Sequence, residues 1–117
     1  KTDEEKAARK AAMQEGLKKA VKVPLKTMQL ADECWPTMVE MAKVGNYSSR
    51  SDLEVGAKSL QTGIWGAHKN VMINLPGIDD ESFVGEITEK ADEILNRAHK
   101  MTEEVLCIIA NRDGDVV

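Results

Sequence analysis

Apolar residues recur at alternating intervals of three and four near the C-terminal end of this chain. The series comprises Val84, Ile87, Ala91, Ile94, Ala98, Met101, Val105 and Ile108. Because an α-helix has 3.6 residues per turn, this spacing places all eight side chains on one stripe, as in the seam of a helical bundle or coiled coil. The sequence shows no strand pattern, internal repeat or low-complexity tract. We therefore predict an all-α fold, a bundle of about three to five helices whose long final helix carries a heptad seam.

A second series with the same spacing runs through two prolines in the first third of the chain. Its members are Leu17, Val21, Pro24, Met28, Ala31, Trp35, Met38 and Ala42. Proline has no N–H and clashes with the preceding turn, so Pro24 and Pro36 should each break or kink a helix. Because the phase survives both, we expect two helices or one kinked helix, with Pro24 near the first turn of the second piece. Gly45-Asn46 is the expected C-terminal stop.

Capping and turn residues predict the ends of the remaining helices. A capping box at the start of the third helix is formed either by Ser49 with Asp52 or by Ser51 with Glu54. Pro76-Gly77 marks the turn that follows this helix, and Asp79 or Asp80 is suited to cap the last one. We expect the tail from Asn111 onward to be frayed.

The length and charge of the chain limit the classes of protein to which it can belong. With 117 residues the chain forms one domain at most, and aromatic residues make up only 3% of it. A net charge of -4 gives no electrostatic footprint for nucleic acid or an anionic membrane surface, and no apolar run reaches the roughly 20 residues of a membrane span. The polar opening "KTDEEKAARK" resembles the solvated start of a helix rather than a natural terminus, so we expect a fragment.

The two cysteines do not suggest a metal site. Cys34 and Cys107 are far apart in sequence, with no CxxC and no histidine at metal-ligand spacing. We expect no metal, and we predict that both cysteines are buried free thiols in a reducing, cytoplasmic compartment.

The predicted third helix contains three interior glycines. Gly56, Gly63 and Gly66 each cost about 0.5–1 kcal/mol relative to alanine, so they need a packing or functional reason. With Ser59 and Ala67 they share one narrow stripe of the helix. An apolar stripe lies beside it, consisting of Leu53, Leu60, Ile64, Val71 and Leu75. A stripe of small residues lets another backbone or a flat ligand approach the helix axis closely.

Polar residues on the same stripe leave two interpretations open. In the structural one, Asp52 is a cap partner, Asn70 and Asn74 satisfy neighbouring backbone groups, and the glycines serve helix packing. In the functional one, a carboxylate and amides orient a polar, planar ligand in a pocket. His68 and His99 fall toward the polar side of their helices, which predicts surface residues rather than an acid or a base.

Two large side chains lie outside both stripes of the predicted third helix. Trp65 and Met72 project among charged residues, a pattern that fits a subunit contact or a second packing surface equally well.

Three segments together resemble a known enzyme family. They are "VPLKTM" at 23–28, "WPTMVEMAKVGNYSSRSDLEVGAKSLQTGIWGAHKNVMINL" at 35–75, and the following "DDESF". The chain resembles the C-terminal part of the cyclodeaminase domain of formimidoyltransferase-cyclodeaminase over residues 1–112, with 113–117 as a frayed tail. Members of that family carry an upstream glycine-rich segment and an alanine-rich helix that help form the folate site. Neither is present here, so we expect a partial domain that is inactive alone.

The resemblance implies a tetrahydrofolate derivative as substrate. Cyclodeaminases convert 5-formimidoyltetrahydrofolate to 5,10-methenyltetrahydrofolate and ammonia during histidine breakdown, and a related branch acts as methenyltetrahydrofolate cyclohydrolase. They are helical bundles that work as dimers, and the bifunctional enzyme assembles into larger rings in which a transferase domain precedes the cyclodeaminase. A non-catalytic helical dimerisation module is the alternative from another class of protein.

The same resemblance suggests roles for residues of this chain. Asp52 is the expected catalytic carboxylate, which would supply a proton to the leaving ammonia and stabilise a cationic carbon centre. Asn46, Asn70 and Asn74 would orient the pterin or amide groups, and Arg50 would meet the glutamate carboxylates of folate. Gly56 and Gly63 would form the close wall of the pocket.

Overall fold

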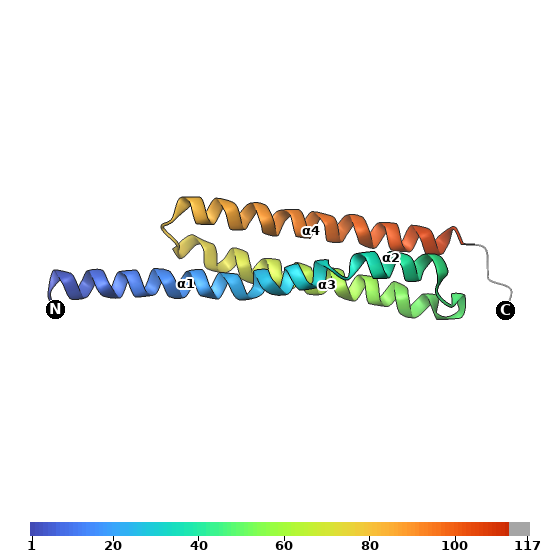
Figure 1. Ribbon diagram of the computed structural model, residues 1–117, viewed down its shortest axis with the longest axis horizontal. Helices are drawn as coiled ribbons and strands as arrows, with labels where there is room; N and C mark the ends of the chain where they lie inside the picture. The colour runs from blue at the N-terminus through green and yellow to red at the C-terminus, as the bar shows by residue number, and fades with distance from the viewer. Residues whose placement is uncertain (113–117) are drawn as a thin grey trace.

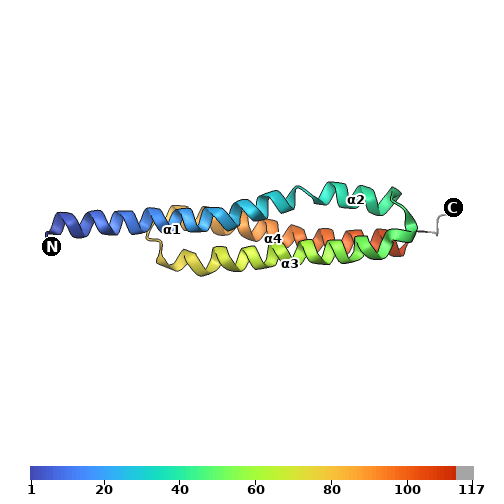
Figure 2. The same ribbon diagram turned by 90° about the horizontal axis from the view of Figure 1, so that it is seen from below.

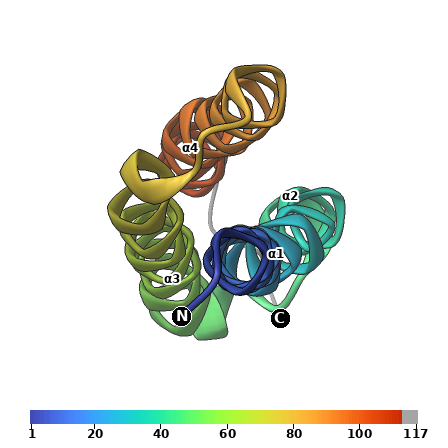
Figure 3. The same ribbon diagram turned by 90° about the vertical axis from the view of Figure 1, so that its left-hand side faces the viewer.

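The computed structural model describes residues 1–112, and these form an all-α bundle with no strand among them. Its elements are α1 (Asp3–Asp32), α2 (Trp35–Val44), the 3-10 turn η1 (Tyr47–Ser49), α3 (Arg50–Asn74), the 3-10 turn η2 (Leu75–Gly77) and α4 (Glu81–Ala110). α1 and α2 follow one another in one direction, α3 returns beside them, and α4 runs forward again (Figure 1). The result is a rod of 76 × 19 × 16 Å, and Figure 3 views it from one end. The predicted all-α bundle is confirmed.

The two prolines behave differently. α1 begins at the Thr2 cap and continues without interruption through Pro24. The helix instead ends at Asp32 and restarts at Trp35, and the break between α1 and α2 is visible in Figure 2. Pro36 lies in the first turn of α2, where a missing N–H leaves no helical hydrogen bond unmade. The prediction of two helices is therefore confirmed, but the expectation that Pro24 begins the second one is wrong.

The corner between α2 and α3 is closed by Gly45 and Asn46. The Gly45 N–H donates to the Met41 carbonyl at 2.8 Å, and the Asn46 side chain accepts from the backbone N–H of Ser48 at 3.1 Å. Ser49 makes no side-chain cap hydrogen bond, and Ser51 lies inside α3. Both predicted capping boxes are therefore wrong, because Asn46 has begun a 3-10 turn three residues earlier.

The turn between α3 and α4 is fastened to α1. Asp80 caps α4 as predicted, accepting from the Phe83 N–H at 3.1 Å, and its other oxygen accepts from Lys18 Nζ at 2.9 Å. Gln14 of α1 donates to the Gly77 carbonyl and accepts from the Asp79 N–H, both at 2.9 Å. The hydrogen bond from Lys18, followed by that from the Phe83 N–H, lowers the pKa of Asp80. The chain before Gln14 extends past this turn (Figure 1).

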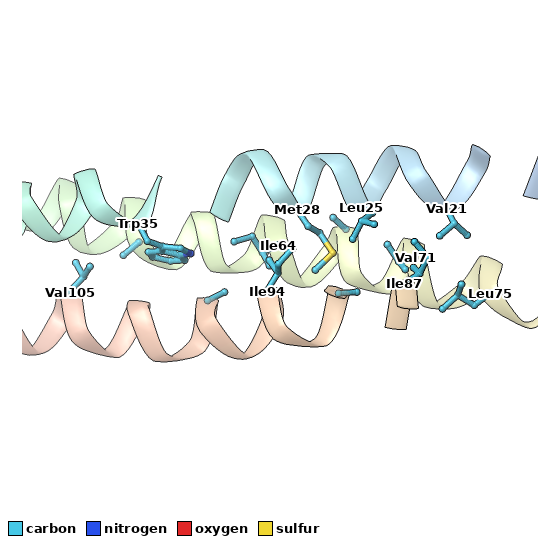
Figure 4. Close-up of a cluster of buried hydrophobic side chains, with 14 of the residues drawn as sticks. Val21, Leu25, Met28, Trp35, Ile64, Val71, Leu75, Ile87, Ile94 and Val105 are labelled. Carbon is cyan, nitrogen blue, oxygen red and sulfur yellow. The ribbon is translucent and has the colours of Figure 1, made fainter. Parts of the chain in front are cut away.

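The core runs along the axis between the three columns of helix (Figure 4). The members of the predicted α4 seam that are buried are Ile87, Ala91, Ile94, Ala98 and Val105, while the other three members are half-buried. Thr102 and Ile109 are buried beside them. The predicted seam is therefore confirmed. Thr102 and Ile109 extend the buried face of α4 to one more heptad position, because a straight helix drifts relative to a strict heptad repeat.

The end of α4 is held against the α2–α3 corner. Arg112 donates from Nη1 to the Ala42 carbonyl at 3.0 Å and from Nη2 to the Gly45 carbonyl at 2.7 Å. Asn111 caps α4 through its backbone N–H, which donates to the Cys107 carbonyl at 3.0 Å. The expectation of fraying from Asn111 is wrong for these two residues, and 113–117 lie outside the described residues.

Candidate functional site

Most of the predicted site residues fall into two groups that lie at different positions along the bundle. Asn46 and Arg50 line a cavity at the α2–α3 corner, whereas Gly63, Asn70 and Asn74 line a groove between α1 and α3. The other two predicted residues lie outside both. Asp52 is exposed in the first turn of α3, and Gly56 packs toward Met38, whose methyl carbon would lie 3.4 Å from an added Cβ. Asp52 and Asn70 are 18 residues apart, a rise of about 27 Å along the helix axis.

The α1–α3 groove is shallow and walled by small side chains. It has a volume of about 530 Å³ and is lined on the α1 side by Ala20, Val23, Pro24 and Thr27. On the α3 side Gly66 and Ala67 join the three predicted residues. A Cβ added to Gly63 or Gly66 would meet no atom of the described residues within 4 Å. The stripe of small residues is thus accessible along this flank of α3.

The residues that line the groove on both helices carry polar groups. Pro24 has no N–H to donate to the carbonyl of Ala20, which leaves this acceptor without its usual helical partner. On the opposite wall, Asn74 Nδ2 donates to the Asn70 carbonyl at 2.8 Å, which fixes one amide in place. A planar ligand with donors and acceptors on its edge would find both amides and a carbonyl here, between walls that allow close approach.

The corner cavity is smaller and positively charged. It has a volume of about 120 Å³, and its polar lining includes Asn46, Arg50 and Arg112 around the Tyr47 ring. The Arg50 guanidinium carbon lies 4.3 Å from the centre of that ring and the Arg112 carbon 5.5 Å from it. Arg50 Nη1 also donates to the Tyr47 carbonyl at 3.1 Å. Guanidinium groups held in this way are suited to bind carboxylates or phosphates.

Asp52 is an accessible carboxylate near the α2–α3 corner. It lies in the first turn of α3, where the helix dipole favours a negative charge. Among residues 1–112, no side chain or backbone N–H forms a hydrogen bond or ion pair with it. The structural interpretation of Asp52 as a cap partner of Ser49 is not realised, because Ser49 makes no side-chain cap bond.

His68 is buried, and the prediction that it lies at the surface is wrong. It lies on the flank of α3 that faces α4, four residues after the buried Ile64. Its Nε2 is 2.8 Å from Asp92 Oδ1, while Nδ1 is buried and has no hydrogen-bond partner among the described residues. The spacing from Ile64 was the signal that could have revealed this burial. His99 is exposed as predicted and contacts Gln61.

The other singled-out side chains remain on the surface or beside the core. Trp65 is about half exposed beneath Lys69, whose Nζ lies 5.2 Å from the centre of its ring, while Met72 is half-buried and packs against the core. Cys34 and Cys107 are both exposed, so the prediction of buried thiols is wrong. Cys34 lies in the break between α1 and α2.

Neither a metal cluster nor a membrane span is found in the described part of the chain. Within residues 1–112, no group of three or more His, Cys, Asp or Glu side chains is placed to hold a metal ion. None of the helices in the same range combines the length and apolarity required to cross a membrane.

Comparison with known proteins identifies related chains. The formiminotransferase-cyclodeaminase family profile matches residues 1–110. The formimidoyltransferase-cyclodeaminase of Dictyostelium discoideum is 49% identical over 104 residues, and that of Sus scrofa is 42% identical over 105. These matches cover 89% and 90% of this chain but only 19% of each relative.

A bacterial relative is covered more fully. The methenyltetrahydrofolate cyclohydrolase of Methylorubrum extorquens is 36% identical over 104 residues, which are 89% of this chain and 50% of that protein. The chain thus spans about a fifth of the formimidoyltransferase-cyclodeaminase relatives and half of the cyclohydrolase. Since the family profile covers nearly all the described residues, the chain belongs to the formiminotransferase-cyclodeaminase family.

Proposed function

We propose that this chain is part of a folate-dependent cyclodeaminase, a lyase that converts 5-formimidoyltetrahydrofolate to 5,10-methenyltetrahydrofolate and ammonia. The observation that carries the proposal is the α1–α3 groove, which brings Gly63, Asn70 and Asn74 together with an acceptor carbonyl on Ala20. The names of the relatives support a folate substrate. In this assignment the two amides bind the edge of the pterin ring, and the reaction uses no metal.

The chemistry requires a proton donor beside the reacting carbon. The second folate nitrogen attacks the formimidoyl carbon, the departing nitrogen gains a proton, and ammonia leaves. Asp52 is the proposed general acid and also stabilises the cationic carbon centre. Arg50, with Asn46 in the corner cavity, is the proposed site for the glutamate carboxylates of folate.

The distance between Asp52 and the α1–α3 groove supports a site shared between chains. Asp52 lies about 27 Å along α3 from Asn70, so the carboxylate of one chain does not reach a pterin in its own groove. An oligomer that places Asp52 of one subunit near the groove of another resolves this separation. We propose a cytoplasmic homodimer or larger ring of such subunits.

The parent polypeptide is proposed to be longer than this chain. Relatives that extend well beyond the matched residues support an N-terminal half of the same domain, with a glycine-rich segment, and a preceding transferase domain. Residues 1–112 then form the C-terminal part of the domain, and the chain is inactive alone.

Two other functions have specific support. A methenyltetrahydrofolate cyclohydrolase is favoured by the bacterial relative, half of whose length is covered. A non-catalytic dimerisation module is favoured by the exposed apolar side chains on α1 and α3, among them Val23 and Ile73.

Product analysis with the parent polypeptide and the isolated chain separates these functions. We expect the parent to release ammonia from 5-formimidoyltetrahydrofolate and the isolated chain to show no turnover. Hydrolysis of methenyltetrahydrofolate without ammonia release would assign the cyclohydrolase function, and a parent that binds no folate in calorimetry would leave the dimerisation module. Clear turnover by the 117-residue chain would overturn its assignment as a partial domain.

A further inference from the structure

Pro24 lies inside the 30-residue helix α1, away from both of its ends. Proline is the residue least compatible with a helix interior, because it has no N–H and its ring presses on the carbonyl four residues earlier. Pro36 lies in the first turn of α2, where a missing N–H leaves no helical hydrogen bond unmade. Of the two prolines, Pro24 is therefore the one that weakens the helix containing it.

The backbone effect of Pro24 falls on the carbonyl of Ala20. In an α-helix the carbonyl of one residue accepts from the N–H four residues later, so Pro24 leaves the Ala20 oxygen without its helical donor. On the helix surface this oxygen lies among the residues at the same position and three and four residues later, which are Ala20, Val23 and Pro24. All three line the α1–α3 groove, so the oxygen belongs to the groove wall.

The surroundings of this oxygen leave it accessible. Ala20 and Val23 are exposed, and Ala20 carries only a methyl group that could cover its own carbonyl. Thr27, the hydroxyl on the same wall, is engaged elsewhere, because its Oγ1 donates to the Val23 carbonyl at 3.3 Å. Within residues 1–112, no side chain donates to the Ala20 carbonyl. A ligand in the groove can therefore donate a hydrogen bond to it.

The opposite wall of the groove carries a side-chain amide with both of its polar atoms available. Asn70 is exposed, and its amide forms no hydrogen bond with any other described residue. Asn74 is different, since its Nδ2 already donates to the Asn70 carbonyl at 2.8 Å. A Cβ added to Gly66 would meet no atom within 4 Å, so a flat ring has room beside the Asn70 amide.

These groups match one edge of a pterin ring. The 2-amino-4-oxopyrimidine edge of a pterin presents an amino donor, a ring N–H donor and a carbonyl acceptor in a row. The amide of Asn70 can pair with the ring N–H and the carbonyl, and the Ala20 carbonyl can accept from the amino group. Guanine presents the same edge, and the choice of a pterin rests on the proposed function.

We propose that Pro24 is a specificity-determining residue of the α1–α3 groove, because it keeps the Ala20 carbonyl open to accept from the amino group of the pterin. Proline is the one residue type that can do this, since every other residue returns an N–H to the carbonyl four residues earlier. The weakening of α1 at Pro24 is then the consequence of keeping a backbone acceptor in the groove.

The first experiment measures binding to the parent polypeptide by calorimetry. Pro24→Ala supplies the missing N–H and should weaken the binding of tetrahydrofolate by about 5- to 30-fold. The 2-desamino-2-methyl analogue of tetrahydrofolate has no amino donor, so it should bind the wild type and Pro24→Ala equally. Pro36→Ala, which removes a proline outside the groove, is the matched control and should bind both ligands as the wild type does.

Three results of this experiment would overturn the proposal. Unchanged binding of tetrahydrofolate to Pro24→Ala would show that the Ala20 carbonyl does not contact the ligand. Equal losses for both ligands would show that the substitution alters the shape of the groove instead. Binding of guanosine as tight as that of tetrahydrofolate would exclude a pterin as the specific ligand. Failure of the wild-type parent to bind tetrahydrofolate would overturn the proposed function as well, which distinguishes the two failures.

The second experiment uses the isolated chain and needs no ligand. Pro24→Ala should raise its melting temperature, and the amide introduced at position 24 should exchange with solvent several-fold more slowly than in an unfolded peptide, because it donates to the Ala20 carbonyl. Pro36→Ala should give no such rise, because the N–H that it adds lies in a first turn without a helical acceptor. An unprotected amide at position 24, or no rise in melting temperature, would overturn the proposal.

Discussion

His68 Nε2 of α3 lies 2.8 Å from Asp92 Oδ1 of α4, which joins a side chain that is almost completely buried to a carboxylate that is half exposed. The imidazole is placed within the core, 7% exposed, and Asp92 is its hydrogen-bond partner among the described residues. The pair therefore connects the two helices through a polar contact at the edge of an apolar seam.

Asp92→Ala should destabilise the fold, because it leaves a second nitrogen of a buried imidazole without a partner. We expect a loss of about 1–3 kcal/mol in the free energy of unfolding, measured by urea denaturation. The double variant His68→Phe with Asp92→Ala should lose less than the sum of the two single variants, since no orphaned imidazole remains. If the losses in the free energy of unfolding are strictly additive, the contact between His68 and Asp92 contributes nothing to stability. Gln61→Ala, which removes the partner of the exposed His99, serves as the control.

Arg112→Ala should loosen the corner where α2 meets α3. The guanidinium donates to the carbonyls of Ala42 and Gly45, so its removal should lower the free energy of unfolding by about 1.5–3 kcal/mol. Arg112→Lys should recover only part of this loss, because an ammonium does not reproduce the paired geometry. Full recovery with lysine would show that charge alone is required. Thermal denaturation of both variants beside Lys100→Ala, an exposed residue of α4, checks the prediction.

Asp80 should make stability depend on pH in the acidic range. Its hydrogen bonds with Lys18 and the Phe83 N–H lower its pKa below the ordinary value of 3.8. A lowered pKa in the folded state contributes stability that is present above the unfolded value and is lost as the pH falls through the folded one. Asp80→Asn keeps an oxygen to cap α4 but removes the charge. Its stability deficit in urea titrations should be constant near neutral pH and shrink below about pH 4; a deficit unchanged down to pH 2 would contradict this origin.

Replacement of Gly45 and of Gly63 by alanine should change the stability of the fold in opposite directions. A Cβ on Gly45 would lie 2.5 Å from the Met41 carbonyl oxygen, so Gly45→Ala must shift the backbone that ends α2 and should lower stability. Gly63→Ala fills open space in a helix and should raise stability in the isolated chain by about 0.5–1 kcal/mol. Chemical denaturation of the two variants under the same conditions tests both signs. A gain at Gly45 or a loss at Gly63 would contradict the packing described for α2 and α3.

Asp52→Asn tests the proposed general acid. In the parent polypeptide, loss of the proton donor should reduce turnover of 5-formimidoyltetrahydrofolate by about 10²–10⁴-fold. Stability should change by no more than about 1 kcal/mol, the size of a charge effect at an exposed helix N-terminus. Retained turnover would remove Asp52 from the reaction, and a comparable loss in Ser51→Ala, its exposed neighbour in the first turn of α3, would indicate a general effect on that turn.

Local sequence patterns were sufficient to predict that the helices exist. The three-four alternation predicts the α4 seam, because the buried positions of a helix recur with its period. Asp79 or Asp80 was predicted to cap α4, because a carboxylate just before the first residue of a helix can accept from an unpaired backbone N–H of the first turn. The positions of the helix break and of the first cap were not predictable in the same way. Pro24 and Pro36 have the same local chemistry, yet α1 continues through Pro24, with Val21 and Leu25 buried on either side of it, whereas Pro36 lies in the first turn of α2.

The candidate site was predicted as a stripe of α3 together with Asn46 and Arg50. Gly63, Asn70 and Asn74 of the stripe line the groove because α1 lies against that flank of α3, whereas Asn46 and Arg50 lie apart from them at the α2–α3 corner. His68 and the two cysteines show the same dependence, because the side of a helix that a neighbour covers is set by the neighbour.

The sequence by itself determined the helical fold, the apolar seam, the cap of α4 and the family resemblance, since each depends on residues close together in the chain or on their order. Only the tertiary structure decided which residues share a cavity, which histidine is buried and which glycines face open space. Those properties arise when segments distant in sequence pack together, and no local pattern specifies that contact.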